Sequence, residues 1–158
     1  VDTLHRGVNT VKPSLIRVES DEATYNLHTM VRYEIEKQLV NGNIAIGDLP
    51  EFWNSKMQEY LGVTPPNDTK GLLQDIQWSM GAIGYFPTYT LGNLYAAQLY
   101  AAALADNPTI TEQIAKGQFT VLLDWMRRHI HVTGSKLLPA DLINQATRNT
   151  PNSYYFVT

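Results

Sequence analysis

Apolar residues recur along the chain at helical spacing, and short polar segments with glycine or proline separate these patterns. In residues 20–40, six apolar side chains recur every three or four positions and form one stripe on a helix: Ala23, Leu27, Met30, Val31, Ile35 and Leu39. Ser20 is the expected N-cap of this helix, and Asn41-Gly42 is its expected left-handed end. Arg32 and Glu36 are four residues apart, so we expect them to pair on its outer face.

Similar patterns predict helices through the rest of the chain, whereas residues 1–14 are expected to be irregular. The further helices are expected at 48–62, 109–117, 118–131 and 139–147. Phe119 is expected on the buried face of the third of these. Because few β signals occur, the predicted fold class is all-α, with six or seven helices in a single helical domain over residues 1–158.

The stretch Gly71–Tyr100 departs from this simple pattern, because polar groups and helix breakers precede a long apolar run. We interpret it as a loop or short helix that leads into a buried helix, with Pro87 in the first turn. Tyr85 and Tyr89 are four residues apart and share a face if this turn is helical. The alternative is a kinked core helix in which the tyrosines satisfy local hydrogen bonds.

Composition excludes several classes of protein. The chain has 158 residues, 44% hydrophobic and 17% charged, with a net charge of −3, which suits a folded domain and does not suggest nucleic-acid binding. Without cysteine there is no disulfide and no thiolate site. No apolar run reaches the about 20 residues that span a membrane. Because the first residues lack an initiator methionine and a signal-peptide pattern, we expect a processed start or a cut through a longer protein.

The candidate metal ligands do not form a recognised pattern. The four histidines include no H-E-x-x-H pair, and His129 and His131 point in different directions on a helix. Asp21 and His28 are seven residues apart and could share a helix face, but a surface position for both is the simpler interpretation. We therefore predict no metal site within this chain.

Arg17 lies among apolar residues, and Asp21 follows it by four positions. An arginine in such surroundings is usually paired, so an ion pair at the helix start is one interpretation. The other is a guanidinium fork that binds the carboxylate of a substrate.

Two motifs in this chain resemble those of one enzyme family. The segment PSLIRVESDEATYNLH is similar to the I-R-x-x-A-D region of the carboxypeptidase Taq family of zinc metallocarboxypeptidases, and GLLQDIQW is similar to its G-x-x-Q-D-x-H-W motif. GYFPTYTLGNLYAAQ and HIHVTGSKLLPADLINQAT also resemble that family, so the resemblance covers essentially the whole chain. Two positions depart from it: Ser20 stands where the family has alanine, and Gln77 stands where it has histidine. Glutamine cannot become an imidazolium, so this side chain does not carry the charge or transfer the proton that a histidine can.

The resemblance implies that this chain is the C-terminal part of a larger helical peptidase with a deep groove. The zinc ligands and the catalytic glutamate of the family precede the matched region, so zinc is expected in the full-length protein and none in this fragment. The fragment alone is then expected to be inactive. Its implied partners are a peptide substrate, the missing N-terminal part and a second copy in a homodimer, without nucleic acid or membrane, in the cytoplasm.

The resemblance also assigns roles to single residues. Arg17 is expected near the substrate carboxylate at the closed end of the groove, and three further substrate-binding residues are expected: Asp21, Gln74 and Asp75. Tyr89 is the first choice for a hydroxyl that donates to the developing oxyanion, Tyr85 is the second, and Gln77 is expected beside them. The predicted function is release of C-terminal residues from peptides. The alternative is a helical binding domain that has kept the scaffold and lost the chemistry.

Overall fold

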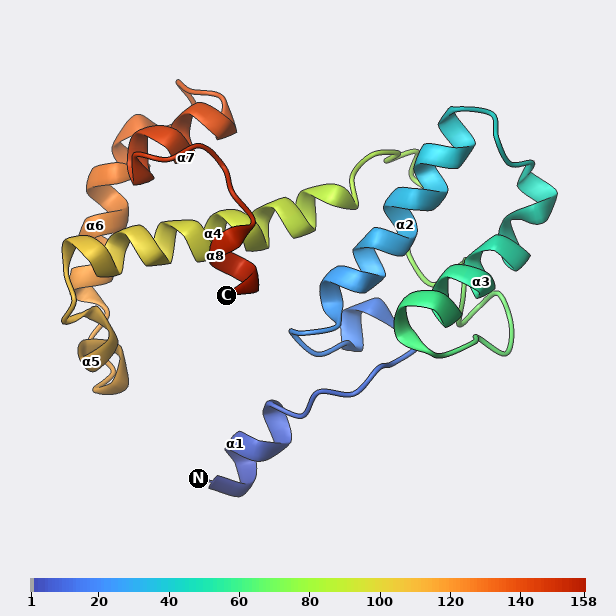
Figure 1. The fold of residues 1–158 in the computed structure, drawn as a ribbon, viewed down its shortest axis with the longest axis horizontal. Coiled ribbons are helices and arrows are strands. Elements are labelled where there is room, and N and C mark those ends of the chain that lie inside the picture. Colours follow the sequence, from blue (N-terminus) through green and yellow to red (C-terminus); the bar gives the residue numbers. More distant parts are fainter. Residues whose placement is uncertain (1) are drawn as a thin grey trace. The chain divides into compact units, whose positions relative to one another are not determined.

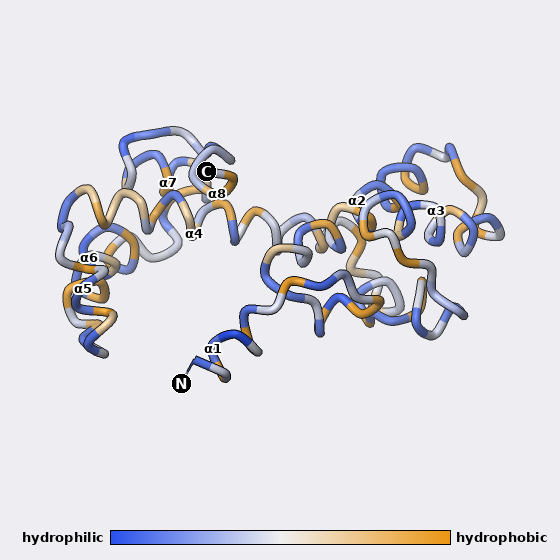
Figure 2. The backbone as a smooth tube through the Cα atoms, turned by 60° about the horizontal axis from the view of Figure 1, so that its bottom comes forward, coloured by the Kyte–Doolittle hydropathy of each residue, from blue (hydrophilic) through white to orange (hydrophobic). Residues whose placement is uncertain are grey.

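A computed structural model describes residues 2–158, and within them every regular element is a helix (Figure 1). The all-α prediction is therefore confirmed. By its contacts the chain divides into two compact units, Val1–Thr90 and Leu91–Thr158. Both contain hydrophobic segments separated by hydrophilic turns (Figure 2). The single domain expected over residues 1–158 stays a prediction.

The core of the first unit lies between two helices, α2 and α3, which run side by side (Figure 1). The elements of this unit are α1 (Asp2–Val8), η1 (Arg17–Glu19), α2 (Tyr25–Val40), η2 (Ile46–Asp48) and α3 (Leu49–Leu61). Six buried residues make the core: Val31, Ile35, Leu49, Trp53, Met57 and Leu61. The stripe predicted on α2 is confirmed at Val31 and Ile35, whereas Met30 is exposed. The prediction of an irregular start is wrong, because α1 is helical.

Helix α2 begins later than its sequence signals predicted. Ser20 is not the N-cap, since its hydroxyl donates to the carbonyl oxygen of Arg17 at 2.6 Å. The N-cap is Thr24, and the Asp21 carboxylate accepts hydrogen bonds from its backbone nitrogen at 2.9 Å and from its hydroxyl at 3.0 Å. Asp21 thus holds residues 21–24 in a turn, which delays the helix to Tyr25.

The ends of α2 and α3 follow the glycine signals in the sequence. Gly42 comes two residues after α2 and has a φ of 68°, and Gly62 caps α3 with the same φ. A side chain is strained in this left-handed region, so glycine ends both helices where the sequence predicts.

The second unit packs around Trp125 and contains most of α4. Its elements are α4 (Pro87–Asp106), which begins in the first unit, α5 (Ile110–Ala115), α6 (Thr120–His129), η3 (His131–Thr133), α7 (Pro139–Thr147) and α8 (Tyr154–Val157). The buried core residues are Ala103, Ile110, Trp125 and Ala146. The indole nitrogen of Trp125 donates to Asp106 at 2.8 Å. Phe119, expected on the buried face, lies before α6 and is exposed, so that prediction is wrong.

A buried amide ties the end of α7 to α4. Gln98 donates through Nε2 to the Thr147 hydroxyl at 2.9 Å, and its Oε1 accepts from the backbone nitrogen of Asn152 at 2.9 Å.

Every helix within residues 2–158 is too short or too polar to span a lipid bilayer.

Candidate functional site

The motif region from Gly71 to Phe86 is a series of turns, and helix α4 starts directly after it. Gly81 and Gly84 both have a positive φ, of 72° and 80°, which breaks any helix before Pro87. Pro87 is the first residue of α4, a position where its missing hydrogen-bond donor costs nothing. The predicted loop that leads into a helix is therefore confirmed, and the alternative of a kinked core helix is wrong. The expected burial of that helix is wrong, because only Gln98 and Ala103 of α4 are buried among the described residues.

Asp75 lies between two buried arginines. Its Oδ1 accepts from Nη2 and Nε of Arg17 at 2.8 and 3.0 Å, and its Oδ2 accepts from Nε of Arg32 at 2.6 Å. The side chains of Arg17, Arg32 and Asp75 are 7%, 0% and 6% exposed. Each carboxylate oxygen thus serves one guanidinium, so this loop residue joins η1 to α2.

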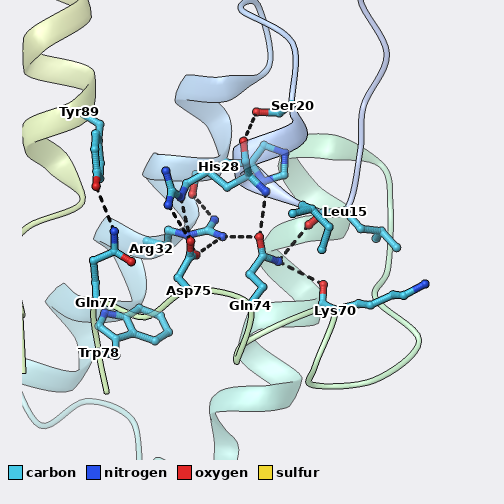
Figure 3. Close-up of polar contacts among 12 residues, drawn as sticks. Leu15, Ser20, His28, Arg32, Lys70, Gln74, Asp75, Gln77, Trp78 and Tyr89 are labelled. Atoms are coloured by element: carbon cyan, nitrogen blue, oxygen red, sulfur yellow. Dashed lines mark hydrogen bonds and ion pairs between the residues drawn. The ribbon is translucent and has the colours of Figure 1, made fainter. Parts of the chain in front are cut away.

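Gln74 completes this cluster with its amide group (Figure 3). Its Oε1 accepts from Nη2 of Arg32 at 2.8 Å and from the backbone nitrogen of Arg17 at 2.9 Å. Its Nε2 donates to the carbonyl oxygens of Leu15 and Lys70 at 3.0 and 3.1 Å. The amide therefore fixes the segment before η1 against the motif loop.

The ion pairs expected from sequence spacing do not form. Arg17 pairs with Asp75 instead of Asp21, and Arg32 is buried on the same carboxylate instead of pairing with Glu36 outside. The reason is that the motif loop brings a buried acid to both arginines, which local spacing does not reveal. Asp21 accepts instead from the backbone nitrogen of Lys12 at 2.9 Å, and this hydrogen bond holds the pKa of Asp21 below its ordinary value.

Aromatic rings surround the two guanidinium groups. Arg17 lies over the rings of Tyr89, Phe86 and Tyr25 at 5.0, 5.5 and 5.8 Å from their centroids. Arg32 lies 4.7 Å from the centroid of a Trp53 ring. Such cation–π contacts stabilise a buried guanidinium and restrict its orientation.

Burial and the shared carboxylate shift the pKa values of the two arginines in opposite directions. Burial lowers the pKa of Arg32 to about 10, although Asp75 opposes the change. Burial also lowers the proton affinity of Arg17, but its hydrogen bond and charge attraction to Asp75 outweigh this effect and raise its pKa. Both guanidiniums are protonated at neutral pH, so the cluster carries one excess positive charge.

Position 77 lies against the tyrosine that the resemblance nominates. Gln77 donates from Nε2 to the hydroxyl oxygen of Tyr89 at 3.0 Å (Figure 3), and its Oε1 is buried without a hydrogen-bond partner among residues 2–158. The rings of Tyr85 and Tyr89 meet edge to face at 5.3 Å between centroids. Because the Gln77 amide donates to the Tyr89 oxygen, the hydroxyl proton of Tyr89 remains available to donate to another acceptor.

Sequence reasoning did not nominate three polar residues that border this cluster. Tyr25 accepts from Nη1 of Arg17 at 2.9 Å, and Glu36 accepts from the indole nitrogen of Trp78 at 2.9 Å. Arg32 was assigned to the surface, although its place one residue after Val31 puts it beside the apolar stripe. That position was the one signal that could have identified it.

His28 is fully buried beside the arginines, and neither ring nitrogen has a hydrogen-bond partner within the described residues. Burial lowers the pKa of His28 to about 4, and the charges of Arg32 and Arg17 add to the effect. The ring is therefore neutral in the folded protein. The prediction of a surface position for His28 is wrong.

We expect His28 to make the folded state sensitive to acid. Its unfolded pKa is about 6.5, so its contribution to stability is fully present above pH 6.5 and is lost as the pH falls toward 4. A tenfold change in proton affinity is worth about 1.4 kcal/mol, so a pKa lowered from about 6.5 to about 4 corresponds to an expected loss of roughly 3 kcal/mol.

Urea unfolding between pH 7.5 and 4 measures this contribution. His28→Gln should lose less stability over that range than the wild type, by roughly 3 kcal/mol. The exposed residue His5 supplies the control, and His5→Gln should follow the wild type. Parallel curves for His28→Gln and the wild type would contradict the assignment.

Residues 2–158 contain no cluster of three or more histidine, aspartate or glutamate side chains that could hold a metal ion. Two of the acidic groups near the arginines are committed to other partners. Asp75 is bound by two guanidiniums, and Asp21 is bound by backbone and hydroxyl donors. The described residues of this chain therefore do not fit a metal site by themselves.

The sequence matches a family model along its whole length. Residues 1–158 match the model described as carboxypeptidase Taq (M32) metallopeptidase. The chain belongs to the carboxypeptidase Taq family. It is 46% identical over 157 residues to thermostable carboxypeptidase 1 of Thermus thermophilus and 43% identical over 157 residues to carboxypeptidase 1 of Bacillus subtilis. Each alignment covers 99% of this chain and 31% of the relative, so the chain spans about a third of the length of these carboxypeptidase Taq relatives.

Solved structures agree with this membership. The chain superposes on metallocarboxypeptidase 1 of Trypanosoma cruzi with a TM-score of 0.94 at 40% identity, covering 99% of this chain and 33% of that one. It superposes on the M32 carboxypeptidase of Deinococcus radiodurans with a TM-score of 0.95 at 39% identity, covering 99% and 32%. The resemblance drawn from the two sequence motifs is confirmed, and so is the helical scaffold of the carboxypeptidase Taq family.

Proposed function

We propose that this chain is the C-terminal part of a zinc-dependent carboxypeptidase that releases C-terminal residues from peptides. The observation that carries the proposal is the buried cluster in which the two family motifs meet. Arg17 comes from the first motif, and Gln74 and Asp75 come from the second. The match along the whole chain and the names of the relatives support the same conclusion.

The family description implies a metal, and the described residues of this chain do not fit one. We therefore assign the zinc and its ligands to a part of the protein outside this sequence. The same assignment makes the 158-residue chain inactive by itself. We also propose that the complete protein acts on peptides, forms a homodimer and is located in the cytoplasm.

The role that we propose for the cluster is to hold the Arg17 guanidinium in place for the substrate carboxylate. Arginine has five N–H groups, and three of those on Arg17 already bind Asp75 and Tyr25. The remaining two can donate to a carboxylate, while Asp75 and Gln74 fix the guanidinium in place. Asp21 supports the same segment, because it accepts from the backbone of Lys12.

Tyr89 is our candidate for the hydroxyl that donates to the oxyanion, with Tyr85 as second choice. The hydrogen bond from Gln77 orients Tyr89 without occupying its proton. Such a donor stabilises charge that develops in the transition state. Gln77 also favours a second candidate function, a binding domain without catalysis, because a neutral amide stands where the family has histidine.

The complete protein distinguishes these two functions. We expect it to contain one zinc per chain and to release the C-terminal residue of an unblocked peptide, whereas the 158-residue chain contains no stoichiometric zinc. Elemental analysis and a peptide-hydrolysis assay measure both quantities. A complete protein that binds peptides with a free C-terminus but never cleaves them supports the binding domain, and zinc held by residues 1–158 alone contradicts our assignment.

Arg17→Lys should weaken the recognition of a free carboxylate, because an ammonium group replaces the guanidinium fork. We expect kcat/KM for peptides with a free C-terminus to fall by about 10- to 100-fold, the value of a charge-assisted hydrogen bond. The matched substrate is the same peptide with an amidated C-terminus, whose cleavage should change far less. Equal losses on the two substrates would mean that Arg17 only holds the fold.

A further inference from the structure

Glu36 is a buried carboxylate that no cation within the described residues neutralises. It is 4% exposed, and its Oε1 accepts from the indole nitrogen of Trp78 at 2.9 Å. Its Oε2 is buried and has no hydrogen-bond partner among residues 2–158. The nearest arginine on α2, Arg32, is committed to Asp75, and no ion pair joins Glu36 to Lys37 in the described part of the chain.

The same residue lines an open groove in the first unit. The groove has a volume of about 340 Å³, and four of the residues that line it with Glu36 are mostly apolar: Tyr33, Val40, Ile83 and Pro87. Lys37, Asn41 and Gly84 complete the lining, and Lys37 forms no ion pair with Glu36 among the described residues. Val40, Ile83 and Tyr33 are 73%, 53% and 48% exposed. Four of the lining residues lie in α2 and Asn41 follows directly after it, whereas three come from the loop and first turn that follow the second family motif.

Physical chemistry makes this combination unfavourable when the groove is left open. An ionised carboxylate removed from water is costly unless a cation and further hydrogen bonds accompany it. Exposed apolar side chains around it add surface that association would cover. The carboxylate needs a cation, and the apolar side chains need an apolar cover. The side chains of arginine and lysine supply both, because each combines a positive charge with an apolar stem.

We propose that the groove receives a basic side chain, arginine or lysine, from the part of the same protein that lies outside this sequence. The inference rests on the proposed function, in which residues 1–158 are about a third of the protein. Some two thirds of the polypeptide are then available to cover this face. The basic side chain binds Glu36, and its segment packs on Tyr33 and Val40. Trp78 couples this contact to the second motif, because its indole already holds the other oxygen of Glu36.

A photo-crosslinker in the complete protein tests the identity of the occupant. With p-benzoylphenylalanine in place of Val40, we expect a cross-link to a peptide of the same polypeptide that lies outside residues 1–158 and carries an arginine or lysine. Ile46 is exposed outside the groove and supplies the control position. Cross-links that stay within residues 1–158, or that join only two copies of the protein, would overturn the proposal.

Two variants test the charge. Glu36→Gln keeps the size and the acceptor for Trp78, and we expect it to lose most of the Val40 cross-link, whereas Lys37→Gln should keep it. Where Glu36→Gln folds poorly, Glu36→Arg combined with glutamate at the identified basic residue should restore the cross-link. A cross-link unchanged in Glu36→Gln would overturn the role of the carboxylate. The cross-link does not depend on peptidase activity. If the complete protein has no peptidase activity, the proposed function is wrong, but the predicted contact at Glu36 can still be detected.

Discussion

Asp75→Asn is expected to lower the free energy of unfolding of residues 1–158 by about 3–5 kcal/mol, the cost of breaking a buried ion pair. Two guanidiniums, one of them fully buried, share this carboxylate. The substitution leaves both without a countercharge, and an amide group cannot accept at both of its ends. Urea denaturation followed by tryptophan fluorescence measures the loss, since Trp53 lies against Arg32.

An exposed ion pair supplies the control for this prediction. Asp124 pairs with Arg127 at 3.2 Å with both side chains at least half exposed, so Asp124→Asn should change stability by less than about 1 kcal/mol. The double variant of Asp75→Asn with Arg17→Gln should lose less than the sum of the single losses, because the two residues share one interaction. If Asp75→Asn loses no more stability than the control variant Asp124→Asn, the cluster does not hold the motif loop.

Tyr89→Phe is expected to lower kcat of the complete protein by about 10²- to 10³-fold, the usual loss when one oxyanion donor is removed. The substitution deletes the hydroxyl that accepts from Gln77 and keeps the ring that packs on Tyr25, Tyr85 and Phe86. Folding should therefore be retained, which circular dichroism and thermal unfolding check. Hydrolysis of an unblocked peptide gives the turnover.

Tyr85→Phe is the matched variant, and we expect it to keep most of the turnover because Tyr85 is the more exposed of the two tyrosines. Gln77→His should raise turnover if a histidine at this position adds a proton donor beside Tyr89. Should both phenylalanine variants keep wild-type turnover, the tyrosines pack the loop against α4 and take no part in the reaction.

The sequence alone determined the helical class, the family and several helix ends. The predicted helix over residues 139–147 matches α7, and Gly42 and Gly62 end α2 and α3 where expected. These features depend on residues within one or two turns of each other, because helix spacing, capping and left-handed glycine are local properties. The family motifs were also visible in the sequence, since a motif is a contiguous pattern.

Only the tertiary structure decided which charged groups pair and which are buried. Arg17 and Asp75 are 58 residues apart, and Arg32 and Asp75 are 43 apart, so spacing along a helix favoured nearer partners that do not bind. The motif loop decides the outcome, because it brings one carboxylate to two arginines and one indole to Glu36. A buried charge takes the partner that burial supplies, and burial depends on how distant segments pack.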